Sequence, residues 1–394
     1  MRIGIDGRCL QDNPRTGVGE AAFHLIKNLA RIDRSLEIFV LLNACGNIGI
    51  DFSEPNIVII KKNIPNKLLN ASLKFFKKPL LDSFFDIIDL FFAPNWNFIS
   101  LSPDLPFVLT VHDLSIFLYP EFYSPYSRFW HKKLLDIKGL IARANYLIVP
   151  SQTTKNDLQK LFPGTESKAV IIPWGADHIK EAQSSAPEAH QPWAEKLKVQ
   201  SFGNKYILYL ATVEERKNVR GLIAAYEYAR EKKMIGGNIN LILAGPKGYG
   251  FSAIKKMTEK SKFVSRIKIL GPVSDEQKKD LYANASVFAY PSFYEGFGFP
   301  PLEAMAFGVP VIASSSASLG EILGNAALLV QPYQTAELAA AISNILNDEN
   351  LRNVYAQRGL ELAKRYQWED AAHKLSTVFK SAFNGHRHLT ESEI

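Results

Sequence analysis

Two glutamates are the strongest candidates for chemistry in this 394-residue chain, and both lie in YPSFYEGFGFPPLEAMAFGVPVIAS (290–314). Glu295 precedes a glycine-containing loop, and Glu303 falls in a helix predicted from Leu302 to Phe307. Where such a loop enters a helix, backbone N–H groups and the helix dipole favour an anion, and a carboxylate there can accept hydrogen bonds from sugar hydroxyls. A bare pair of glutamates is more often a surface feature, and two carboxylates can also form the acid–base pair of a glycoside hydrolase.

An adjacent pair of cations, Arg216 and Lys217, lies in TVEERKN (212–218), between a predicted strand (206–211) and a predicted helix (219–233). A phosphate leaving group gains negative charge as its bond to a sugar breaks, and fixed cations stabilise that charge. Arginine can also grip a phosphate through two parallel hydrogen bonds. Most adjacent Arg–Lys pairs are simply solvated. Cations at a helix N-terminus oppose the helix dipole, however, so this pair favours an anionic ligand.

A histidine and two glycines follow predicted strands in the first half of the chain. His112 ends the apolar run FVLTVH, which places it at the ligand-binding edge of an open sheet. Gly17 and Gly19 in TGVG precede a helix predicted from Gly19 to Ile32, and glycine lets backbone N–H groups approach a phosphate or a sugar. A lone histidine is more often structural, and a single His–Asp dipeptide is weak evidence for a metal. Because no cluster has metal-ligand spacing, we expect no metal.

Short apolar runs that alternate with helical patterns must position these residues. Continuous apolar runs are typical of strands buried on both faces of a parallel sheet. The alternation predicts an α/β protein with doubly wound, Rossmann-like parallel sheets and right-handed crossovers. The predicted strands are 2–6, 37–42, 56–60, 86–93, 106–112, 146–150, 169–173, 206–211, 240–245, 266–271, 286–291, 309–314 and 326–330, with further helices at 126–144, 153–161 and 276–283.

The alternating pattern stops between the two halves, in KEAQSSAPEAHQPWAEKLKVQSFGN, which is rich in Ser, Ala, Pro, Gln and charge. We therefore predict an N-terminal domain at 1–180, a linker at 181–204 and a C-terminal domain at 205–367. The helical pattern at 368–384 is expected to complete the first domain. Two open sheets facing each other would hold a ligand in the cleft beyond the carboxyl ends of their strands.

The composition, with 47% hydrophobic and 22% charged residues, is ordinary for a folded protein and excludes disordered and collagen-like chains. Two cysteines, Cys9 and Cys45, are too few for a disulfide framework and fit a reducing cytosol. We find no signal peptide and no apolar run of about 18 residues, so we expect a cytoplasmic protein with at most peripheral membrane contact. The net charge of +7 is compatible with three kinds of partner: nucleic acid, anionic small molecules and an anionic membrane surface.

Much of the positive charge lies between Pro55 and Asp82, in a stretch that has six lysines and no acidic residue. Its basic, amphipathic part NKLLNASLKFFKKPLL can lie on an anionic bilayer, at about 1 kcal/mol per basic residue near the surface. The alternative is a solvated helix that packs its leucines on the sheet. Nucleic acid is a poorer match, because no zinc spacing, aromatic RNA-binding motif or basic recognition helix is present. The lysines are Lys61, Lys62, Lys67, Lys74, Lys77 and Lys78.

Several separated stretches together resemble the retaining glycosyltransferases of family 4, which have the two-domain GT-B fold. They are RIGIDGRCL…TGVGE, FVLTVHDL, YLIVPSQTTKNDL, VIIPWGADH, YLATVEERKN, LILAGP, ILGPVSDEQKKDLYANASVFAYPS and EGFGFPPLEAMAFGVPVIAS. The resemblance implies a metal-independent hexosyltransferase, similar to bacterial mannosyltransferases of surface-glycan synthesis, with the acceptor on the first domain and a nucleotide-sugar on the second. Two positions depart from the family pattern: Glu20, where arginine often follows the second glycine, and Trp174, where asparagine is usual.

The resemblance also assigns roles. Glu303 would bind the nucleotide ribose, and Glu295 would contact the donor sugar. Arg216 and Lys217 would stabilise the diphosphate, and His112 would bind a sugar hydroxyl and stabilise the developing oxocarbenium ion. Of these, His112, Glu295, Arg216 and Lys217 are the expected catalytic residues. The remaining donor contacts would come from Gly17, Gly19, Gly245, Val273, Phe297, Gly298 and Phe299.

The donor base is the least determined part of this interpretation. Asp275 in GPVSDEQKK could accept hydrogen bonds from guanine N1–H and N2–H, which would favour GDP-mannose. The alternative is that Ser274 caps a helix with Asp275 and Glu276 in its first turn. UDP- and dTDP-sugars stay open, and the expected acceptor is a glycan or a polyprenyl-diphosphate-linked one in O-antigen or other surface-polysaccharide synthesis. A sugar-nucleotide epimerase or hydrolase of the same fold also stays open, as does a silent glycan- or nucleotide-binding protein.

Overall fold

The computed structural model describes residues 1–11, 16–43, 49–181 and 205–385, and the chain divides into two compact units. The first unit comprises Met1–Gly175 with Gln367–Ile394, and the second comprises Ala176–Tyr366. The predicted linker, 181–204, lies outside the described residues from position 182 onward. The domain boundaries expected from the sequence stay a prediction, and each unit is built around its own parallel sheet.

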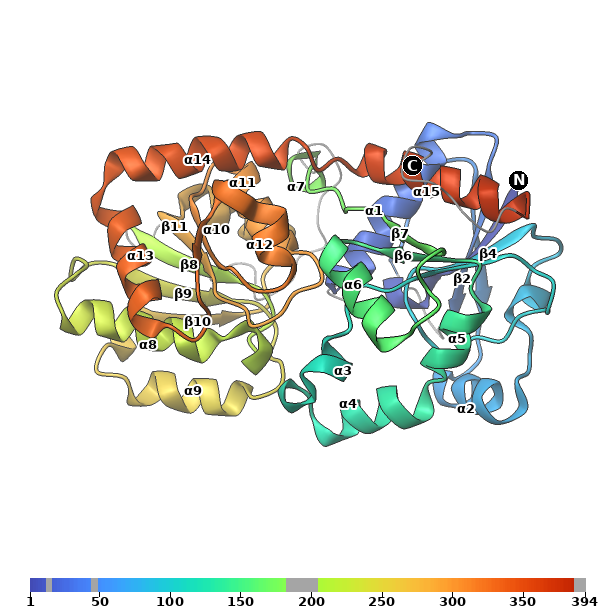
Figure 1. The fold of residues 1–394 in the computed structure, drawn as a ribbon, viewed down its shortest axis with the longest axis horizontal. Coiled ribbons are helices and arrows are strands. Elements are labelled where there is room, and N and C mark those ends of the chain that lie inside the picture. The colour runs from blue at the N-terminus through green and yellow to red at the C-terminus, as the bar shows by residue number, and fades with distance from the viewer. Residues whose placement is uncertain (12–15, 44–48, 182–204, 386–394) are drawn as a thin grey trace. The chain divides into compact units, whose positions relative to one another are not determined.

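Seven parallel strands form the sheet of the first unit, in the order β3-β2-β1-β4-β5-β6-β7. Figure 1 labels four of them, β2, β4, β6 and β7. β1 is an interior strand, because Ile3 pairs with Ile38 of β2 on one side and with Leu90 of β4 on the other. The central strands are buried on both faces, which explains their continuous apolar sequences. The strands are β1 Arg2–Asp6, β2 Glu37–Asn43, β3 Ile57–Lys62, β4 Leu90–Ala93, β5 Phe107–Thr110, β6 Tyr146–Val149 and β7 Ala169–Ile171.

Helices cover both faces of this sheet. On one face α1 packs against α15, and Phe379 of α15 meets Phe92 of β4. On the other face α2, α5 and α6 bury Leu73, Ile141 and Leu158 in one apolar core with the strands. The helices are α1 Gly17–Ile32, α2 Asn66–Phe76, α3 Ser115–Leu118, α4 Pro125–Phe129, α5 Ile137–Arg143, α6 Gln152–Leu161 and α15 Trp368–Phe383.

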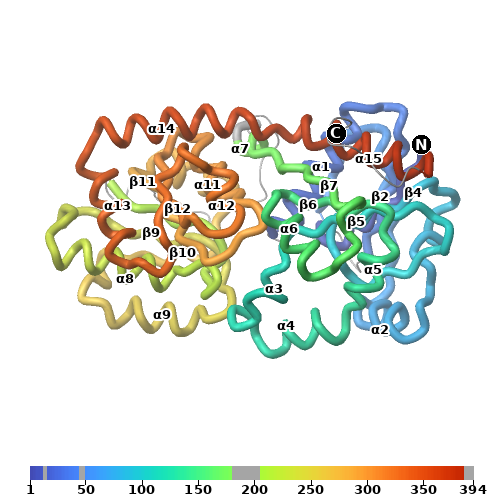
Figure 2. The backbone as a smooth tube through the Cα atoms, viewed as in Figure 1, coloured from blue at the N-terminus to red at the C-terminus, as the bar shows by residue number. Residues whose placement is uncertain are grey.

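The second unit has a six-stranded parallel sheet in the order β10-β9-β8-β11-β12-β13. The backbone trace shows helices on both sides of its strands (Figure 2). Among them α8 packs on α13, and α11 packs on α14. The strands are β8 Tyr206–Leu210, β9 Asn240–Ala244, β10 Ile267–Gly271, β11 Val287–Tyr290, β12 Val311–Ser314 and β13 Leu328–Val330. The helices are α7 His178–Glu181, α8 Val219–Glu231, α9 Phe251–Lys260, α10 Asp275–Asn284, α11 Phe299–Ala306, α12 Ser318–Leu323, α13 Thr335–Asn347 and α14 Glu349–Ala363.

All the predicted strands are present, several with shifted ends, and three of the differences from the predicted elements have a clear physical cause. β4 begins at Leu90 and not at residue 86, because Asp89 turns back to accept hydrogen bonds from the backbone N–H and the guanidinium of Arg2. Helix α1 begins two residues early, because Thr16 caps it. The helix predicted at 126–144 is broken into α4, a π-helical turn at Trp130–Leu134, and α5. The break ends at Asp136, whose side chain caps α5.

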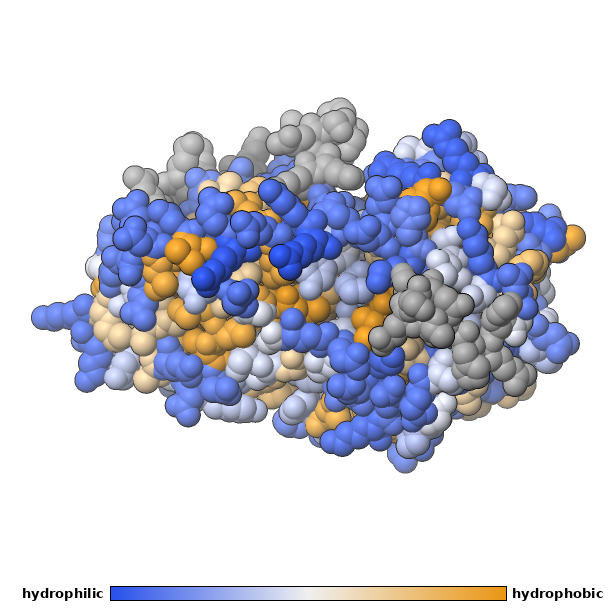
Figure 3. Space-filling model, turned by 45° about the horizontal axis from the view of Figure 1, so that its top comes forward, coloured by the Kyte–Doolittle hydropathy of each residue, from blue (hydrophilic) through white to orange (hydrophobic). Residues whose placement is uncertain are grey.

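One face of the molecule carries hydrophilic side chains over most of its area, with hydrophobic side chains in several separate patches (Figure 3). Scattered patches of this kind are normal on folded proteins and do not by themselves indicate an interface. In the part of the chain that the structure describes, no helix combines the length and the apolar character needed to cross a membrane.

Candidate active site

The strand order of the second sheet reverses between β8 and β11, which are hydrogen-bonded neighbours. In open α/β sheets, ligands bind beyond the carboxyl ends of the strands at such a switch point. The connection after β8 carries Arg216 and Lys217, and the connection after β11 carries Glu295. The fold therefore brings together three predicted site residues that lie 78 and 79 positions apart in the chain.

Lys217 and Glu295 form a close, buried ion pair. The Lys217 ammonium donates to the two carboxylate oxygens of Glu295, at 2.6 and 2.7 Å, and to the Tyr290 hydroxyl at 2.9 Å. Arg216 Nη1 donates to the Tyr294 carbonyl at 2.9 Å and to Glu295 Oε2 at 3.4 Å. The side chains of Arg216, Lys217 and Glu295 are 13%, 10% and 9% exposed, so little water screens their charges.

Two carboxylates balance the two cations, because Arg216 Nη2 also lies 3.0 Å from Glu214 Oε1. Burial alone would raise the pKa of Glu295, but Lys217 and Arg216 outweigh burial and hold that pKa below its ordinary value. Glu295 is therefore ionised at neutral pH. An incoming anion must compete with these carboxylates, and Lys217 already directs its ammonium at Glu295 and Tyr290. Arg216 is thus the cation better placed to exchange a carboxylate for a phosphate.

Glu303, on α11, is the centre of a second charged cluster. Lys278 Nζ donates to Glu303 Oε1 at 2.6 Å, and the Tyr282 hydroxyl donates to Oε2 at 2.9 Å. His178 Nε2 lies 3.3 Å from Oε1. Burial raises the pKa of Glu303, but Lys278 and His178 reverse that effect and hold the pKa far below its ordinary range. A carboxylate has about four lone-pair sites, so this fixed group can still accept a hydrogen bond from a hydroxyl.

These electrostatics argue against a hydrolase acid–base pair. A general acid needs a carboxyl whose pKa is raised towards neutral pH. The pKa values of Glu295 and Glu303 are both lowered, because each carboxylate is paired with a buried or half-buried lysine. Both glutamates are suited to accept hydrogen bonds, and neither is suited to donate a proton.

The loop between Glu295 and α11 is held by Ser318, whose hydroxyl lies 2.8 Å from the carbonyl oxygens of Glu295 and of Phe297. Gly298 has a φ of +131°, and a Cβ there would lie 2.8 Å from Leu319 Cδ2, so the loop requires glycine. Phe297 is buried, and its ring meets Phe299 edge to face at 5.4 Å.

The start of α11 offers an anion fewer backbone donors than the sequence predicts. Because the helix begins at Phe299, Pro300 and Pro301 occupy its next two positions. Proline fits the first turn of a helix but has no N–H. The first three residues of α11 therefore supply a single N–H group, that of Phe299. An anion at this end would depend on Arg216 more than on backbone donors.

Gly245, Val273 and Asp275 follow β9 and β10 at the same edge of the sheet. A Cβ at Gly245, where φ is +135°, would lie 2.0 Å from the Ala211 carbonyl oxygen, so strand packing alone requires glycine there. Val273 is half-buried and Asp275 is exposed. Ser274 and Gln277 form a reciprocal capping box at the start of α10, so the helix cap expected as the alternative for this segment is present. Base recognition by Asp275 stays a prediction.

In the first unit, His112 lies just beyond β5 and turns towards the residue that follows β4. Its Nε2 is 2.7 Å from the Pro94 carbonyl oxygen, which can only accept, so Nε2 carries the proton. Burial lowers the pKa of His112, so the ring is neutral and Nδ1 is a hydrogen-bond acceptor. The ring lies 5.7 Å from that of Trp174, which is buried and stacks on Trp368 of α15.

Gly17 and Gly19 lie in the first turn of α1. The Gly19 N–H donates to the Thr16 side chain at 3.4 Å, so the capping residue already uses this donor. A Cβ at Gly17 would meet nothing within 4 Å, so packing does not explain a glycine at that position. Glu20, in the same turn, lies 3.4 Å from His24. The structure places these residues beyond β1, and their contact with a ligand stays a prediction.

Sequence reasoning missed a buried pair beside these glycines. Arg8 donates to both carboxylate oxygens of Asp6, each at 2.7 Å, and to the Phe98 carbonyl at 2.8 Å. The pair connects the ends of β1 and β4, where the strand order of the first sheet reverses. Arg8 Nη1 is buried, and no described residue accepts from it. Because a buried donor without a partner is costly, Arg8 is a further candidate for ligand contact.

The residues that hold the two glutamates in place were not predicted from motifs either. Glu214 lies in the motif TVEERKN, but nothing in the pattern indicated that it would pair with Arg216. Tyr290 lies in an apolar strand and Tyr282 in a polar helix. Neither stretch indicated that the Tyr290 hydroxyl would contact Lys217 or that the Tyr282 hydroxyl would donate to Glu303. His178 follows a loop, where spacing gives no orientation. Among the described residues, no group of three or more His, Cys, Asp or Glu side chains could hold a metal ion.

Comparison with known proteins agrees with this geometry. A model of glycosyltransferase family 4 matches residues 15–179, and a model described as glycosyl transferases group 1 matches residues 194–362. An Escherichia coli protein named O-antigen chain mannosyltransferase B is 30% identical over 390 residues, covering 93% of this chain and 96% of the relative. The chain belongs to glycosyltransferase family 4. Another relative of this glycosyltransferase, the O-antigen chain mannosyltransferase RfbU of Salmonella typhimurium, is 29% identical over 60% of each chain.

Solved structures show the fold of this glycosyltransferase. Sucrose-phosphate synthase from Thermosynechococcus elongatus superposes with a TM-score of 0.71 at 19% identity, covering 98% of this chain and all of the other. The Anabaena protein Alr3699/HepE, solved with UDP and glucose, gives a TM-score of 0.70 at 20% identity over 96% and 99% of the two chains. The predicted GT-B class with two Rossmann-like sheets is confirmed, and the enzyme is a hexosyltransferase.

Proposed function

We propose that this glycosyltransferase moves mannose from GDP-mannose to a glycan acceptor of O-antigen or related surface-polysaccharide synthesis, with retention of configuration. The observation that carries transferase chemistry is the buried cluster of Arg216, Lys217 and Glu295 at the switch point of the second sheet. The choice of mannose is supported by the names of the two O-antigen mannosyltransferase relatives.

In the proposed reaction, the bond between the anomeric carbon and the β-phosphate oxygen breaks, and the diphosphate leaves with its electron pair. Arg216, and behind it Lys217, stabilise the charge that develops on the leaving group. The acceptor hydroxyl attacks on the same face and gives its proton to the leaving phosphate oxygen. Glu295 and the neutral ring of His112 accept hydrogen bonds from the sugar, and Glu303 accepts from the ribose. Two protein cations suffice here, so the proposal includes no metal.

The donor base is proposed to be guanine, read by Asp275. This aspartate is exposed in the first turn of α10, at the edge of the sheet that carries the two glutamates. A carboxylate there can accept two N–H groups from guanine and none of that kind from uracil. The capping box of Ser274 and Gln277 fixes the turn without using the Asp275 side chain.

The acceptor is proposed to be lipid-linked, so that the enzyme works at the cytoplasmic face of a membrane. The lysine-rich segment supports this. In α2, Leu69 and Leu73 pack into the core, as expected for a helix packed on the sheet, but Leu68, Phe75 and Phe76 remain 64%, 71% and 75% exposed among the lysines. Exposed aromatic rings beside basic side chains are typical of surfaces that lie on anionic lipid.

The donor is tested by thermal unfolding with GDP, UDP, dTDP and ADP, because a ligand stabilises the protein by RT ln(1 + [L]/Kd). GDP should give the largest shift, and Asp275→Asn should reduce the GDP shift more than the UDP shift. Arg216→Gln should weaken GDP binding and lower turnover of GDP-mannose by about a hundredfold, whereas Arg358→Gln, at an exposed position of α14, should change neither.

Three results would count against the proposal. A larger shift with UDP than with GDP would overturn the assignment of Asp275. Normal turnover by Arg216→Gln would overturn the diphosphate role. An epimerised nucleotide-sugar, formed from GDP-mannose without acceptor, would replace transfer by epimerisation.

A further inference from the structure

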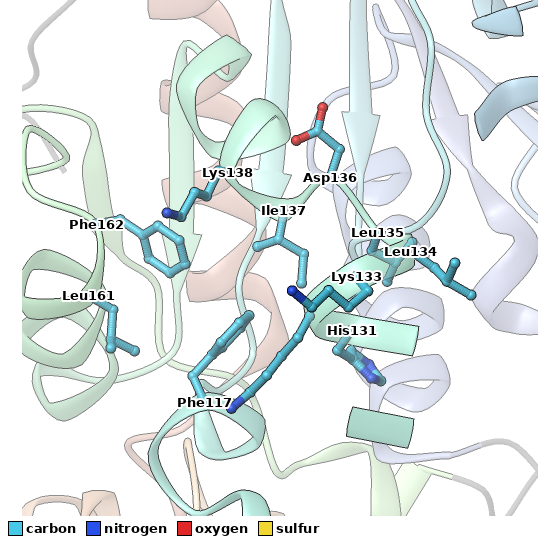
Figure 4. A pocket seen from close by; sticks show the side chains of 11 residues that line it. Phe117, His131, Lys133, Leu134, Leu135, Asp136, Ile137, Lys138, Leu161 and Phe162 are labelled. Carbon is cyan, nitrogen blue, oxygen red and sulfur yellow. The ribbon is translucent and has the colours of Figure 1, made fainter. Parts of the chain in front are cut away.

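A cavity of about 560 Å³ lies in the first unit, and none of the residues assigned to the donor lines it. It is lined by residues 131–134 of the π-helical turn Trp130–Leu134, the start of α5, the C-terminal end of α6 with Phe162, and Phe117 of α3 (Figure 4). Its volume is in the range of sites that hold small-molecule ligands. Nothing in the proposed donor chemistry uses it.

The cavity wall is strongly basic. Lys132, Lys133 and Lys138 line it, and among the described residues none of these lysines forms an ion pair or a side-chain hydrogen bond. The one carboxylate in the wall, Asp136, is occupied, because it caps α5 through the Gly139 N–H and lies 3.7 Å from Lys77. Three exposed lysines and one carboxylate therefore line this space, and their net positive charge favours an anionic ligand.

The rest of the wall is apolar. Phe117, Ile137 and Phe162 face the same space as the ammonium groups of Lys133 and Lys138 (Figure 4). Phe117 and Phe162 also meet edge to face, with ring centres 5.8 Å apart, which fixes this side of the cavity. Basic groups around an apolar floor match a ligand that has both a phosphate and a hydrocarbon part.

A π-helical turn of the backbone forms the basic side of the cavity. The Leu135 N–H donates to the Trp130 carbonyl at 3.0 Å, a π-helical bond that interrupts the helix predicted at 126–144. The turn widens the helix where the residues from His131 to Leu134 line the cavity. π-Helical turns are rare and are frequent at functional sites, because they cost regular hydrogen bonding.

We infer that this cavity binds the phosphorylated end of the lipid-linked acceptor, a phosphate or diphosphate ester of a long apolar alcohol. The inference rests on the proposed function, in which the acceptor is lipid-linked. The volume admits a phosphate group and the first part of the hydrocarbon, so the rest of the tail must leave the cavity. Tyr126 and Phe129 of the adjoining α4 are 70% and 54% exposed and offer apolar surface beside it.

The test uses the full chain, with GDP at saturation to occupy the donor site, and farnesyl diphosphate as the probe. Binding is followed by tryptophan fluorescence, since Trp130 opens the π-helical turn. Farnesyl diphosphate should bind at least about tenfold more tightly than inorganic diphosphate or farnesol, because only it fills both halves of the cavity. The double variant Lys133→Gln/Lys138→Gln should weaken binding at least about tenfold, and Lys256→Gln/Lys260→Gln, on exposed α9, should not.

Equal affinity of the wild type and the Lys133→Gln/Lys138→Gln variant would overturn the inference, as would inorganic diphosphate binding as tightly as farnesyl diphosphate. A transfer assay separates this failure from failure of the proposed function. The variant should have a raised KM for a diphosphate-linked acceptor, an unchanged KM for the same glycan without lipid, and an unchanged GDP shift. If the wild type transfers mannose to both acceptors and the variant does so equally, the function stands and the cavity assignment fails.

Discussion

At the scale of single residues, the two cations of the candidate site differ in what they do. Lys217 places its ammonium against both oxygens of Glu295 and the Tyr290 hydroxyl, so its contacts are internal. Arg216 instead divides its donors among two carboxylates, Glu214 and Glu295, and the Tyr294 carbonyl, so no single partner holds it. We therefore expect Lys217 to contribute most to the stability of the cluster and Arg216 to contribute most to binding of the diphosphate.

Lys217→Met should destabilise the second unit by about 3–5 kcal/mol, because it leaves the Glu295 carboxylate buried with a weaker partner. Replacing both groups, as Lys217→Met/Glu295→Leu, should restore part of this loss. Unfolding is best followed by circular dichroism or calorimetry, because every described tryptophan belongs to the first unit. A loss below about 1 kcal/mol in the single variant would contradict the buried pair.

The lowered pKa values of Glu295 and Glu303 predict how stability depends on pH. An unfolded glutamate has a pKa of about 4.3, and both folded values are lower. The unfolded chain therefore binds more protons at acid pH, so the stabilisation is complete above about pH 5 and is lost as the pH falls below about 4. Urea unfolding between about pH 7 and about pH 3 should show this slope in the wild type and a smaller slope in Glu303→Gln. Identical slopes would mean that Glu303 contributes nothing to it.

Residue types and order indicated side chains that the fold brings together, but not what holds them there. The motifs located Arg216, Lys217 and Glu295 because those residues occur in connections after strands. The sequence did not predict the residues that pair with these side chains, because such contacts depend on distances across the fold. An example is the 3.3 Å between His178 and Glu303, and Glu214 and Tyr282 are further cases. Asp6 and Arg8 were missed for the same reason, since only the neighbouring β4 segment supplies Phe98 as their third partner.

At the scale of elements, backbone geometry decides which glycines are required by packing. Gly245 directly follows β9, Gly271 is the last residue of the adjacent β10, and both have positive φ. A Cβ at Gly245 would lie 2.0 Å from a backbone oxygen, whereas a Cβ at Gly271 would meet nothing within 4 Å. Similar positions in the sheet thus impose different constraints.

Gly245→Ala should prevent stable folding of the second unit or cost several kcal/mol, because a rigid strand must move. Gly271→Ala should cost only about 1–2 kcal/mol, the penalty of a left-handed conformation in a residue with a Cβ. Thermal unfolding of both variants beside the wild type measures the difference. Comparable losses in the two variants would show that the backbone after β8 does not approach Gly245 so closely.

Strands were predicted more reliably than helix breaks, for a physical reason. A buried parallel strand needs a continuous apolar run, which is visible in the sequence. Whether a helix breaks depends on the competition between backbone hydrogen bonds that continue it and side-chain hydrogen bonds that cap a new helix. At Leu135–Asp136 the side-chain cap of α5 ends the preceding π-helical turn, and the apolar periodicity of 126–144 continues across it. The basic cavity lies at this break, which the apolar periodicity of the sequence did not predict.

At the scale of the whole molecule, the net charge of +7 is unevenly distributed. The cations of the donor cluster are matched by Glu214 and Glu295, so they add little to the external field. The lysines that remain exposed include Lys61, Lys67, Lys77 and Lys78, from the stretch without acidic residues. The basic character of the protein therefore belongs mainly to one region of the first unit, which also exposes aromatic rings.

This distribution predicts selective binding to anionic membranes. The full chain should sediment with vesicles that contain phosphatidylglycerol and not with pure phosphatidylcholine, and added salt should weaken the binding. Lys67→Gln/Lys74→Gln/Lys78→Gln should lower the partition coefficient by about a hundredfold, since each lysine near the surface contributes about 1 kcal/mol. Lys255→Gln/Lys256→Gln/Lys260→Gln on α9 changes the net charge equally and should have little effect.

Phe75→Ser/Phe76→Ser keeps every charge, so a loss of binding there would show that the rings enter the lipid. Equal losses in the two lysine variants would mean that total charge, and not the α2 surface, drives the attraction.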